Sequence, residues 1–158
     1  MEIAKIVKYL QLEQQKDNTS FRCLDIGGGN GNMLSTLHHF WSSLLKDMNN
    51  YQEDQLLPWI CLDSDQWIET YSRDHTNISY LFFDHETNQF PSNLGNFDVI
   101  FCMVSLHHMT LEIRHLVLSF IFTLLKPNGK LLIKEHDCDT NETRQFIEWE
   151  HHLYHLLD

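Results

Sequence analysis

The sequence contains no hydrophobic run that approaches the ~18 residues needed to cross a lipid bilayer. Its opening stretch, MEIAKIVKYLQLEQQK, alternates charged and apolar side chains and lacks the apolar core of a secretory signal peptide. These absences argue against a membrane or secreted protein. We therefore expect a cytoplasmic protein with no membrane partner.

Positive charge is scarce in this chain. It carries 11 Lys and Arg against 22 Asp and Glu, which gives a formal net charge of −11. This excess of negative charge argues against wrapping a long nucleic acid, because that binding depends on neutralising many phosphates. A short or terminal RNA segment stays compatible, since a few local Lys and Arg suffice for it.

Paired cysteine motifs are missing as well. The four cysteines are widely separated, without a CxxC pair or a disulfide-like spacing, at Cys23, Cys61, Cys102 and Cys138. The first three lie in apolar, strand-like segments. This distribution predicts reduced, buried cysteines.

Internal repeats, low-complexity segments and linkers are also absent. Hydrophobic residues make up 42% of the 158 residues, which excludes general disorder. The length suits one domain with a hydrophobic core and is too short for a cofactor domain with a substantial second domain. We expect a single domain over residues 1–158.

Segments typical of strands alternate with segments typical of helices. Apolar residues at helical spacing and short apolar runs predict, in order, helix 3–12, strand 21–26, helix 33–45, strand 58–63, short helix 65–73, strand 78–83, strand 97–104, helix 111–125, strand 130–135 and an amphipathic helix from Phe146 onward. Thr110 is the expected cap of helix 111–125. This alternation predicts an α/β fold whose parallel sheet is covered by helices on both faces.

The central motif is LDIGGGNGNML, residues 24–34, between a predicted strand and a predicted helix. A glycine-rich turn alone is weakly informative, because dinucleotide-binding folds and tight structural turns share it. Asp25 narrows the choice, since dinucleotide folds place an apolar residue there and bind pyrophosphate at the helix N-terminus. A carboxylate at the strand end suits a cationic ligand, and Gly27, Gly29 and Gly31 let the backbone approach it closely.

Acidic residues end the next two predicted strands. Asp63 can accept hydrogen bonds from both ribose hydroxyls of a nucleoside, while a helix-capping role fits Asp65 better. Asp84 can accept an adenine amino group while Phe83 packs on the ring. The alternative for Asp84 is a turn-forming residue.

Five segments in order resemble the successive motifs of class I S-adenosylmethionine-dependent methyltransferases, namely LDIGGGNGN, CLDSD, FFDHETNQFP, FDVIFCMVSLHHM and LLKPNGKLLIKEHD. The resemblance covers residues 21–137. It implies a Rossmann-like sheet of order 3-2-1-4-5 that binds S-adenosylmethionine and releases S-adenosylhomocysteine. The cofactor would lie over the carboxyl ends of the strands.

The resemblance also implies roles for individual residues. The candidate cofactor-binding residues are Asp25, Gly27, Gly29 and Gly31 at the methionine part, with Gly28 and Asn30 beside them, Asp63 and Ser64 at the ribose, Phe83, Asp84 and His85 at the adenine, and Met103, Val104 and Ser105 beneath the reactive methyl group. The chain departs from the family in one respect, because no sixth or seventh strand is evident. The edge beyond the fifth strand then needs a cover or a protein partner.

The methyl acceptor is the least defined feature. The segment FCMVSLHHM lacks the Asn/Asp-Pro-Pro-Tyr/Phe pattern of many nucleic-acid methyltransferases. Ribose 2′-hydroxyl methyltransferases use a Lys-Asp-Lys-Glu set, and although Lys134 lies where they have a lysine, the sequence contains no complete set of this kind. Because methyl transfer depends chiefly on alignment, a site without a base suits an acceptor with a ready lone pair. The ending KEHDCDT…FIEWEHHLY resembles small viral RNA methyltransferases, which favours guanine N7 of an RNA cap, in the host cytoplasm.

Several residues could bind or activate the acceptor. The candidates for stacking on or hydrogen-bonding a base are Trp41, His107, His108, Glu135, His136 and Tyr154. A rival interpretation is a small-molecule or RNA 2′-hydroxyl methyltransferase, with catalytic candidates His107, His108, Lys134 and Glu135. A second rival interpretation is a methyltransferase-like module that has no catalytic activity and binds a partner protein. His151 and His155 share a helix face, but nothing completes a metal site, so none is expected.

Overall fold

The computed structural model describes residues 21–46, 59–64, 75–84, 90–136, 140–147 and 149. Its elements are β1 (Cys23–Ile26), α2 (Asn32–Lys46), β2 (Trp59–Asp63), β3 (Ile78–Phe82), β4 (Phe97–Met103), the 3-10 helix η2 (Leu106–His108), α4 (Leu111–Leu124) and β5 (Leu125–Lys134). Residues 141–147 form a further helical segment. The predicted helices 3–12 and 65–73, and the predicted continuation of the last helix to Leu157, lie outside the described residues.

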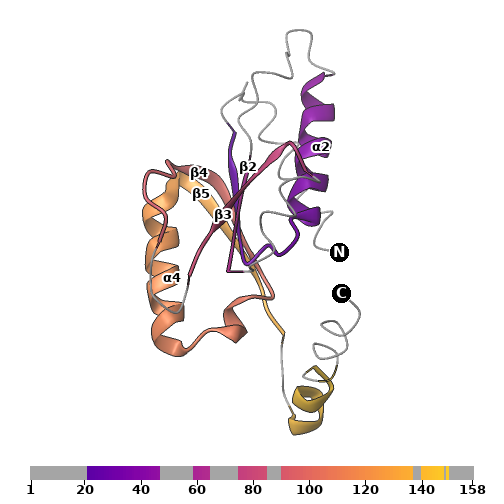
Figure 1. The fold of residues 1–158 in the computed structure, drawn as a ribbon, viewed down its shortest axis with the longest axis vertical. Helices are drawn as coiled ribbons and strands as arrows, with labels where there is room; N and C mark the ends of the chain where they lie inside the picture. Colours follow the sequence, from indigo (N-terminus) through magenta and orange to yellow (C-terminus); the bar gives the residue numbers. More distant parts are fainter. Residues whose placement is uncertain are drawn as a thin grey trace.

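The five described strands form one parallel sheet in the order β3-β2-β1-β4-β5 (Figure 1). This order confirms the Rossmann-like fold that the sequence predicted. β1 is central, and its Leu24 pairs with Ile60 of β2 on one side and with Ile100 of β4 on the other. The chain therefore changes direction across the sheet between β1 and β4, where doubly wound folds bind their ligands.

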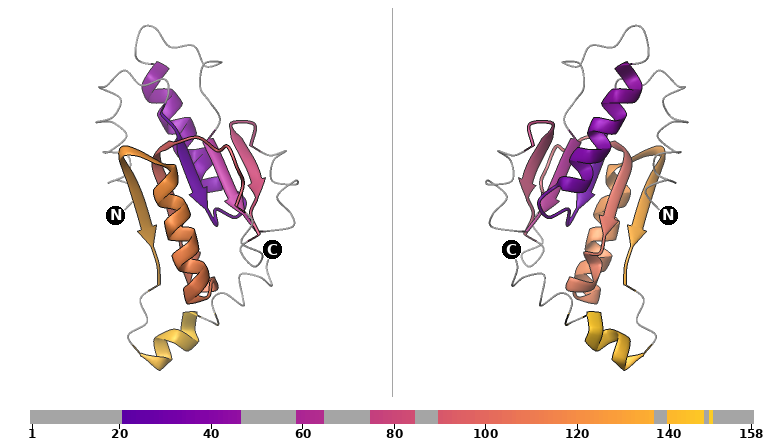
Figure 2. Two further views of the ribbon diagram at one scale, coloured as in Figure 1. Left: turned by 90° about the vertical axis from the view of Figure 1, so that its left-hand side faces the viewer. Right: turned by 90° about the vertical axis from the view of Figure 1, so that its right-hand side faces the viewer.

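The sheet separates two hydrophobic cores because successive strand residues face opposite sides. On one side, Val117 and Ile121 of α4 pack against strand residues such as Leu24 and Ile100. On the other side, α2 packs against the alternate positions, including Cys23 and Phe101. Figures 1 and 2 show α2 and α4 on opposite faces of the sheet. Coverage on both faces explains why β1 is apolar throughout apart from Asp25.

β5 begins at Leu125, earlier than the predicted strand 130–135. α4 ends at Leu124, and the next residue already has extended backbone angles and pairs with Phe97. The register then shifts between Phe97 and Val99, with Asn128 at a φ of 67°. Residues 126–129, which lie between the predicted helix 111–125 and the predicted strand 130–135, therefore form an irregularity inside β5 rather than a separate turn.

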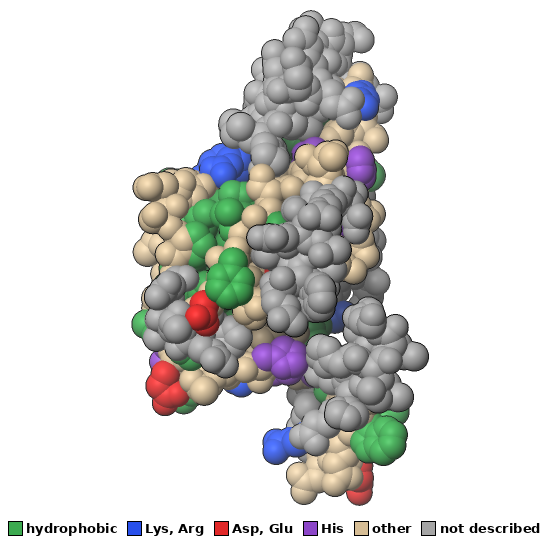
Figure 3. All heavy atoms as spheres, in the orientation of Figure 1, with side chains coloured by type: hydrophobic (Ala, Val, Ile, Leu, Met, Phe, Trp, Pro, Cys, Tyr) green, Lys and Arg blue, Asp and Glu red, His purple; other side chains and the backbone are tan. Residues whose placement is uncertain are grey.

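Helix lengths and the placement of basic side chains describe part of the surface. None of the helices among them has the length and apolar character of a membrane span. Figure 3 shows Lys and Arg side chains separated from one another on one face, with no continuous basic patch among the side chains it colours. Beyond β5, the described residues contain a helical segment and no strand.

Candidate functional site

The loop from Gly27 to Gly31, here called the glycine loop, joins the central strand β1 to α2. Three of its glycines have positive φ angles, 72° at Gly27, 55° at Gly29 and 72° at Gly31. A side chain at Gly27 would collide with Ser105, and one at Gly31 would collide with the Tyr80 hydroxyl. A side chain at Gly29 would meet no atom within 4 Å. The loop thus packs tightly at both ends and leaves space at its tip.

Asp25 lies beneath this loop. Its side chain is 1% exposed, and a Cβ added to Gly28 would approach its Oδ2 atom to 2.7 Å. Burial, together with the charge of Asp63, raises the pKa of Asp25 to about 7. Its Oδ1 atom is buried and has no hydrogen-bond partner among the described residues. The carboxylate therefore sits under the floor of the loop rather than at its surface.

Asp63 lies at the end of β2, as predicted, and contacts the glycine loop directly. Its Oδ2 atom accepts a hydrogen bond from the Gly29 backbone N–H at 2.6 Å. The Cys61 thiol, on the same strand, donates to the Gly29 carbonyl at 3.8 Å. Burial and the charges of Asp25 and Asp63 raise the pKa of this thiol well above its usual range. Ser64 follows and is exposed.

Tyr80 of β3 is a site residue that the sequence analysis missed. Its hydroxyl donates to the Asn30 carbonyl at 2.8 Å and touches the position a Gly31 side chain would occupy. In the register of β2 and β3, Tyr80 pairs with Cys61, whose side chain also reaches the loop. The alternation of β3 carried this signal, because it places Tyr80 on the same face as Ile78, towards α2.

The adenine-side prediction needs a correction at Phe83. Its side chain is 3% exposed and stacks on Phe90 with ring centroids 5.0 Å apart, so it is a core residue. The neighbouring Phe82 is 56% exposed. Asp84 is half-buried after β3, and His85 lies outside the described residues. Strand alternation gives the physical reason, because it turns these two consecutive phenylalanines to opposite sides.

The turn that follows β4, residues 104–107, is here called the switch turn. Val104 has a φ of 56°, an uncommon conformation for a β-branched residue that costs about 1–3 kcal/mol. Its N–H donates to the Lys134 carbonyl at 2.6 Å. The buried Ser105 hydroxyl donates to the Ile26 carbonyl at 3.1 Å, which joins the turn to the end of β1. Met103, just before the turn, is half-buried against the α2 core.

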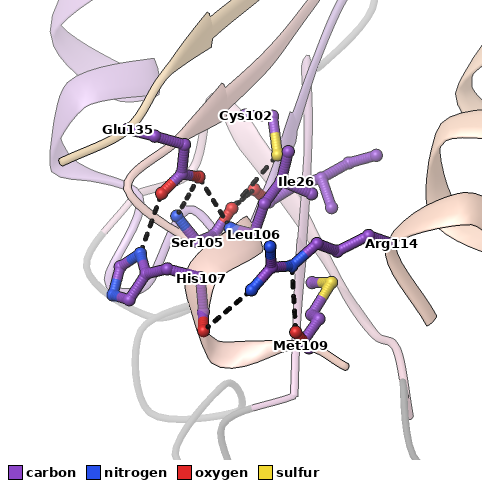
Figure 4. Close-up of polar contacts among 8 residues, drawn as sticks. All are labelled: Ile26, Cys102, Ser105, Leu106, His107, Met109, Arg114 and Glu135. Atoms are coloured by element: carbon purple, nitrogen blue, oxygen red, sulfur yellow. Dashed lines mark hydrogen bonds and ion pairs between the residues drawn. The ribbon is translucent and has the colours of Figure 1, made fainter. Parts of the chain in front are cut away.

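Glu135, directly after β5, holds the switch turn with both carboxylate oxygens (Figure 4). Its Oε1 atom accepts from the N–H groups of Ser105 at 3.1 Å and Leu106 at 2.7 Å. Its Oε2 atom pairs with His107 Nδ1 at 2.8 Å. Partial burial alone would raise the pKa of Glu135, but the hydrogen bonds from His107, Leu106 and Ser105 outweigh it and lower the pKa.

Three imidazole rings gather beside this carboxylate. The ring centroid of His107 lies 3.9 Å from that of His108 and 5.5 Å from that of His136. His108 is exposed, while the Nε2 atom of His107 is buried. The Arg114 guanidinium donates to the carbonyls of Met109 at 3.0 Å and His107 at 3.5 Å. Arg114 was not anticipated, because a helix arginine gives no sign of the backbone it reaches.

Three predicted acceptor-site residues remain, namely Trp41, Lys134 and Tyr154. Trp41 is fully buried and packs on Phe21 with ring centroids 4.6 Å apart, so the prediction that it binds substrate is wrong. Its position on the inner face of α2 directs it into the core. Lys134 is exposed, and Tyr154 lies outside the described residues. The described part of the chain contains no His, Cys, Asp and Glu group suited to a metal ion.

The cysteine prediction is confirmed for the described residues. Cys23, Cys61 and Cys102 are buried free thiols. Burial raises the pKa of all three, in the case of Cys102 to about 11. Cys138 lies outside the described residues.

Comparison with known proteins identifies the family. A family model described as a methyltransferase domain matches residues 2–155. The chain belongs to the methyltransferase domain family. S-adenosylmethionine is the cofactor of this family, which confirms the cofactor expected from the sequence. No curated protein matches this methyltransferase domain in sequence.

Solved methyltransferases share the fold of this domain. CalS10 from Micromonospora echinaspora, an amino pentose methyltransferase with bound SAM, has a TM-score of 0.61 and 16% identity, covering 87% of this chain and 51% of its own. A TehB-like SAM-dependent methyltransferase from Corynebacterium glutamicum has a TM-score of 0.55 and 17% identity, covering 78% and 59%. PKMT2 from Rickettsia typhi, in complex with AdoHcy, has a TM-score of 0.54 and 21% identity, covering 73% and 21%. This methyltransferase domain thus spans only part of each of these chains.

Proposed function

We propose that this chain transfers a methyl group from S-adenosylmethionine to an acceptor at the carboxyl edge of its sheet, and that the acceptor is guanine N7 of an RNA cap. The observation that carries the methyl-transfer proposal is the buried negative charge under the glycine loop. Asp25 has an unpartnered buried Oδ1 atom among the described residues and a pKa of about 7. A cation held above the loop would favour the ionised carboxylate.

The residues present fit this cofactor. Gly29 leaves open space at the tip of the loop, where a nucleoside with an amino-acid tail can approach bare backbone. Asp63 stands beside that tip, where a ribose would require an acceptor, and the charges of Asp25 and Asp63 both suit a positively charged ligand. When bound, the cofactor supplies an electrophilic methyl group on a positively charged sulfur. The protein's task is to align that methyl group with the acceptor.

The environment of the two ring nitrogens of His107 supports guanine N7 as the acceptor. A histidine acting as general base needs an accessible ring nitrogen. Here the Nδ1 atom is paired with Glu135 at 2.8 Å, and the Nε2 atom is buried. An acceptor that already presents a lone pair, such as guanine N7, needs no such base. This arrangement favours N7 over the hydroxyl acceptors of the rival interpretation.

The charge of the surface sets how such an RNA could bind. Lys and Arg side chains stand apart on the face in Figure 3, and Lys126 is paired with Asp98 at 2.7 Å. The chain is therefore suited to the 5′ end of a capped RNA rather than to a long segment, because few phosphates can be neutralised. The exposed His108 and the half-buried His136 offer rings on which a base could stack. We propose the host cytoplasm as the site of action.

Two measurements test the proposal in sequence. Calorimetry with S-adenosylhomocysteine separates an enzyme from a silent scaffold, because an enzyme must bind this product. Tritiated methyl transfer from S-adenosylmethionine is then measured to GpppA-capped RNA, uncapped RNA, and a panel of phenols, catechols and amines. Label on capped RNA alone removes the small-molecule acceptors, and its recovery as 7-methylguanosine after nuclease digestion, rather than on a ribose, supports guanine N7. Label on the small molecules overturns the acceptor proposal but keeps the methyltransferase. An absence of nucleoside binding overturns both.

A further inference from the structure

The carboxylate of Glu135 contacts three consecutive residues at the carboxyl edge of the described sheet. It accepts hydrogen bonds from the backbone N–H groups of Ser105 and Leu106, and it pairs with the imidazole of His107. Three consecutive residues of the switch turn therefore depend on one side chain. Figure 4 shows these contacts converging on Glu135 from one segment of the chain.

The same turn continues into the proposed cofactor site through Ser105. While its N–H is held by Glu135, its hydroxyl donates to the Ile26 carbonyl at 3.1 Å. Its Cβ lies directly against Gly27, leaving no room for a side chain there. The first residue of the glycine loop is thus in contact with a residue whose position Glu135 fixes.

The turn also contains a conformation that would relax without support. Val104 has a φ of 56°, which a β-branched residue adopts only when its surroundings impose it. Lys134, the residue before Glu135, accepts the Val104 N–H at 2.6 Å. The end of β5 therefore fixes the turn by one backbone and three side-chain contacts.

We infer that Glu135 is a positioning residue for the cofactor, which acts through Ser105 to hold the glycine loop in its binding conformation. This inference rests on the proposed function, because it concerns the same cofactor site. The length of the Glu135 side chain matters most for this role, because its carboxylate must reach the N–H groups of Ser105 and Leu106 at once. Its negative charge matters less. Glu135 touches the cofactor nowhere in this scheme, so it is not a catalytic residue.

Three substitutions separate geometry from charge. Glu135→Gln keeps the length and an amide oxygen that can accept from Ser105 and Leu106, but removes the charge. Glu135→Asp keeps the charge but is one methylene shorter and cannot reach both N–H groups. Glu135→Ala removes both. Glu142→Ala, on the exposed helical segment 141–147, is the matched control.

The measurement is calorimetric titration of each purified full chain with S-adenosylhomocysteine. We expect Glu135→Ala and Glu135→Asp to raise the dissociation constant by about tenfold or more, the loss of roughly one hydrogen bond, while Glu135→Gln stays within about threefold. Glu142→Ala should match the unmodified chain. If the binding stoichiometry stays near one, the protein is folded and its affinity for S-adenosylhomocysteine is lowered. If Glu135 only supported folding, the substitutions would lower the binding stoichiometry and leave the dissociation constant unchanged.

The route through Ser105 has its own test. If Glu135 acts through Ser105, then Ser105→Ala and Glu135→Ala together weaken binding by less than the product of their separate effects. Multiplicative effects, a Glu135→Asp that binds better than Glu135→Gln, or an unchanged constant in Glu135→Ala would each overturn the inference. If Glu135→Ala does not fold, the comparison of Asp with Gln decides it. A failure of the unmodified chain to bind the nucleoside identifies the proposed function itself as the error.

Discussion

The carboxylate of Asp63 accepts a hydrogen bond from the backbone N–H of Gly29 at 2.6 Å. The residue that the sequence assigned to a ribose therefore also holds the tip of the loop on which the nucleoside would rest. One side chain at the end of β2 thus couples the conformation of the loop to the binding of its ligand.

Replacement of Asp63 tests this double role. Asp63→Ala loses the contact with Gly29 and any contact with a ribose, so we expect the dissociation constant of S-adenosylhomocysteine to rise by about 100-fold, because hydrogen bonds to charged groups are worth about 1.5–3 kcal/mol. Asp63→Asn keeps an acceptor for Gly29 and should lose only about tenfold. Calorimetry measures both, with thermal unfolding as the control for folding. Equal losses in the two variants would contradict the double role.

Alanine at two adjacent glycines should give opposite results. At Gly29 the new methyl group meets no atom within 4 Å, but it stands where the ligand would lie, and the φ of 55° costs about 1–2 kcal/mol. Gly29→Ala should therefore fold with modestly lower stability and bind S-adenosylhomocysteine at least tenfold more weakly.

Gly28→Ala provides the comparison. Its methyl group would press on Asp25 and Cys61 at 2.7 Å, so the expected main effect is a loss of about 1–3 kcal/mol in the free energy of unfolding. Urea unfolding and calorimetry on both variants measure the two quantities. If Gly29→Ala bound the nucleoside as tightly as the unmodified chain, the open space at the loop tip would not be its binding site.

Much of the fold could be read from the sequence, since periodicity and turn residues carry that information directly. The strand–glycine loop–helix unit was placed correctly because Phe21 to Ile26 is mostly apolar, apart from Arg22 and Asp25, and the glycines follow at once. The sheet order came from the resemblance, because the order in which parallel strands pair leaves no local trace in the sequence.

The candidate site was less accessible from the sequence. Glu135 and Tyr80 bind backbone groups 30 and 50 residues earlier in the chain, and Arg114 binds carbonyls of the turn that precedes α4. Hydrogen bonds to backbone groups leave no pattern in the sequence of the partner segment. Trp41 failed for a related reason. Helical spacing showed that its face was apolar, but an aromatic residue that lines a pocket and one that fills a core have the same spacing.

The stability of the protein should depend on pH through Asp25. Its pKa rises from 3.8 to about 7 on folding, so the native state binds more protons than the unfolded state between these values. The contribution is therefore fully present below about pH 4 and is lost as the pH rises through 7. We expect the unmodified chain to lose about 2–3 kcal/mol relative to Asp25→Asn between pH 5 and pH 8.

Urea unfolding at both pH values, on the unmodified chain and on Asp25→Asn, measures this difference. The variant is the control, because it keeps every other titrating group. Parallel pH profiles for the two proteins would show that Asp25 ionises with an ordinary pKa, and would contradict burial and the charge of Asp63 as causes of a raised pKa.

His107→Ala should be tolerated in the reaction. The substitution removes the contact with Glu135 Oε2, which costs about 1–2 kcal/mol of stability, but both hydrogen bonds to Oε1 persist. Methyl transfer to capped RNA should then stay within about threefold, since guanine N7 requires no base. A loss of about 100-fold with unchanged nucleoside binding would instead make His107 the base for a protic acceptor.

The central position of β1 has a consequence for how this chain is made. Its neighbours in the sheet follow it in translation, and the Arg22 N–H finds its acceptor on Asp98, 76 residues later. At about 5–20 residues per second, β1 therefore lacks its neighbour β4 for about 4–15 seconds after it is translated. The central strand of the sheet is thus translated early and gains its second neighbour only when β4 has been made.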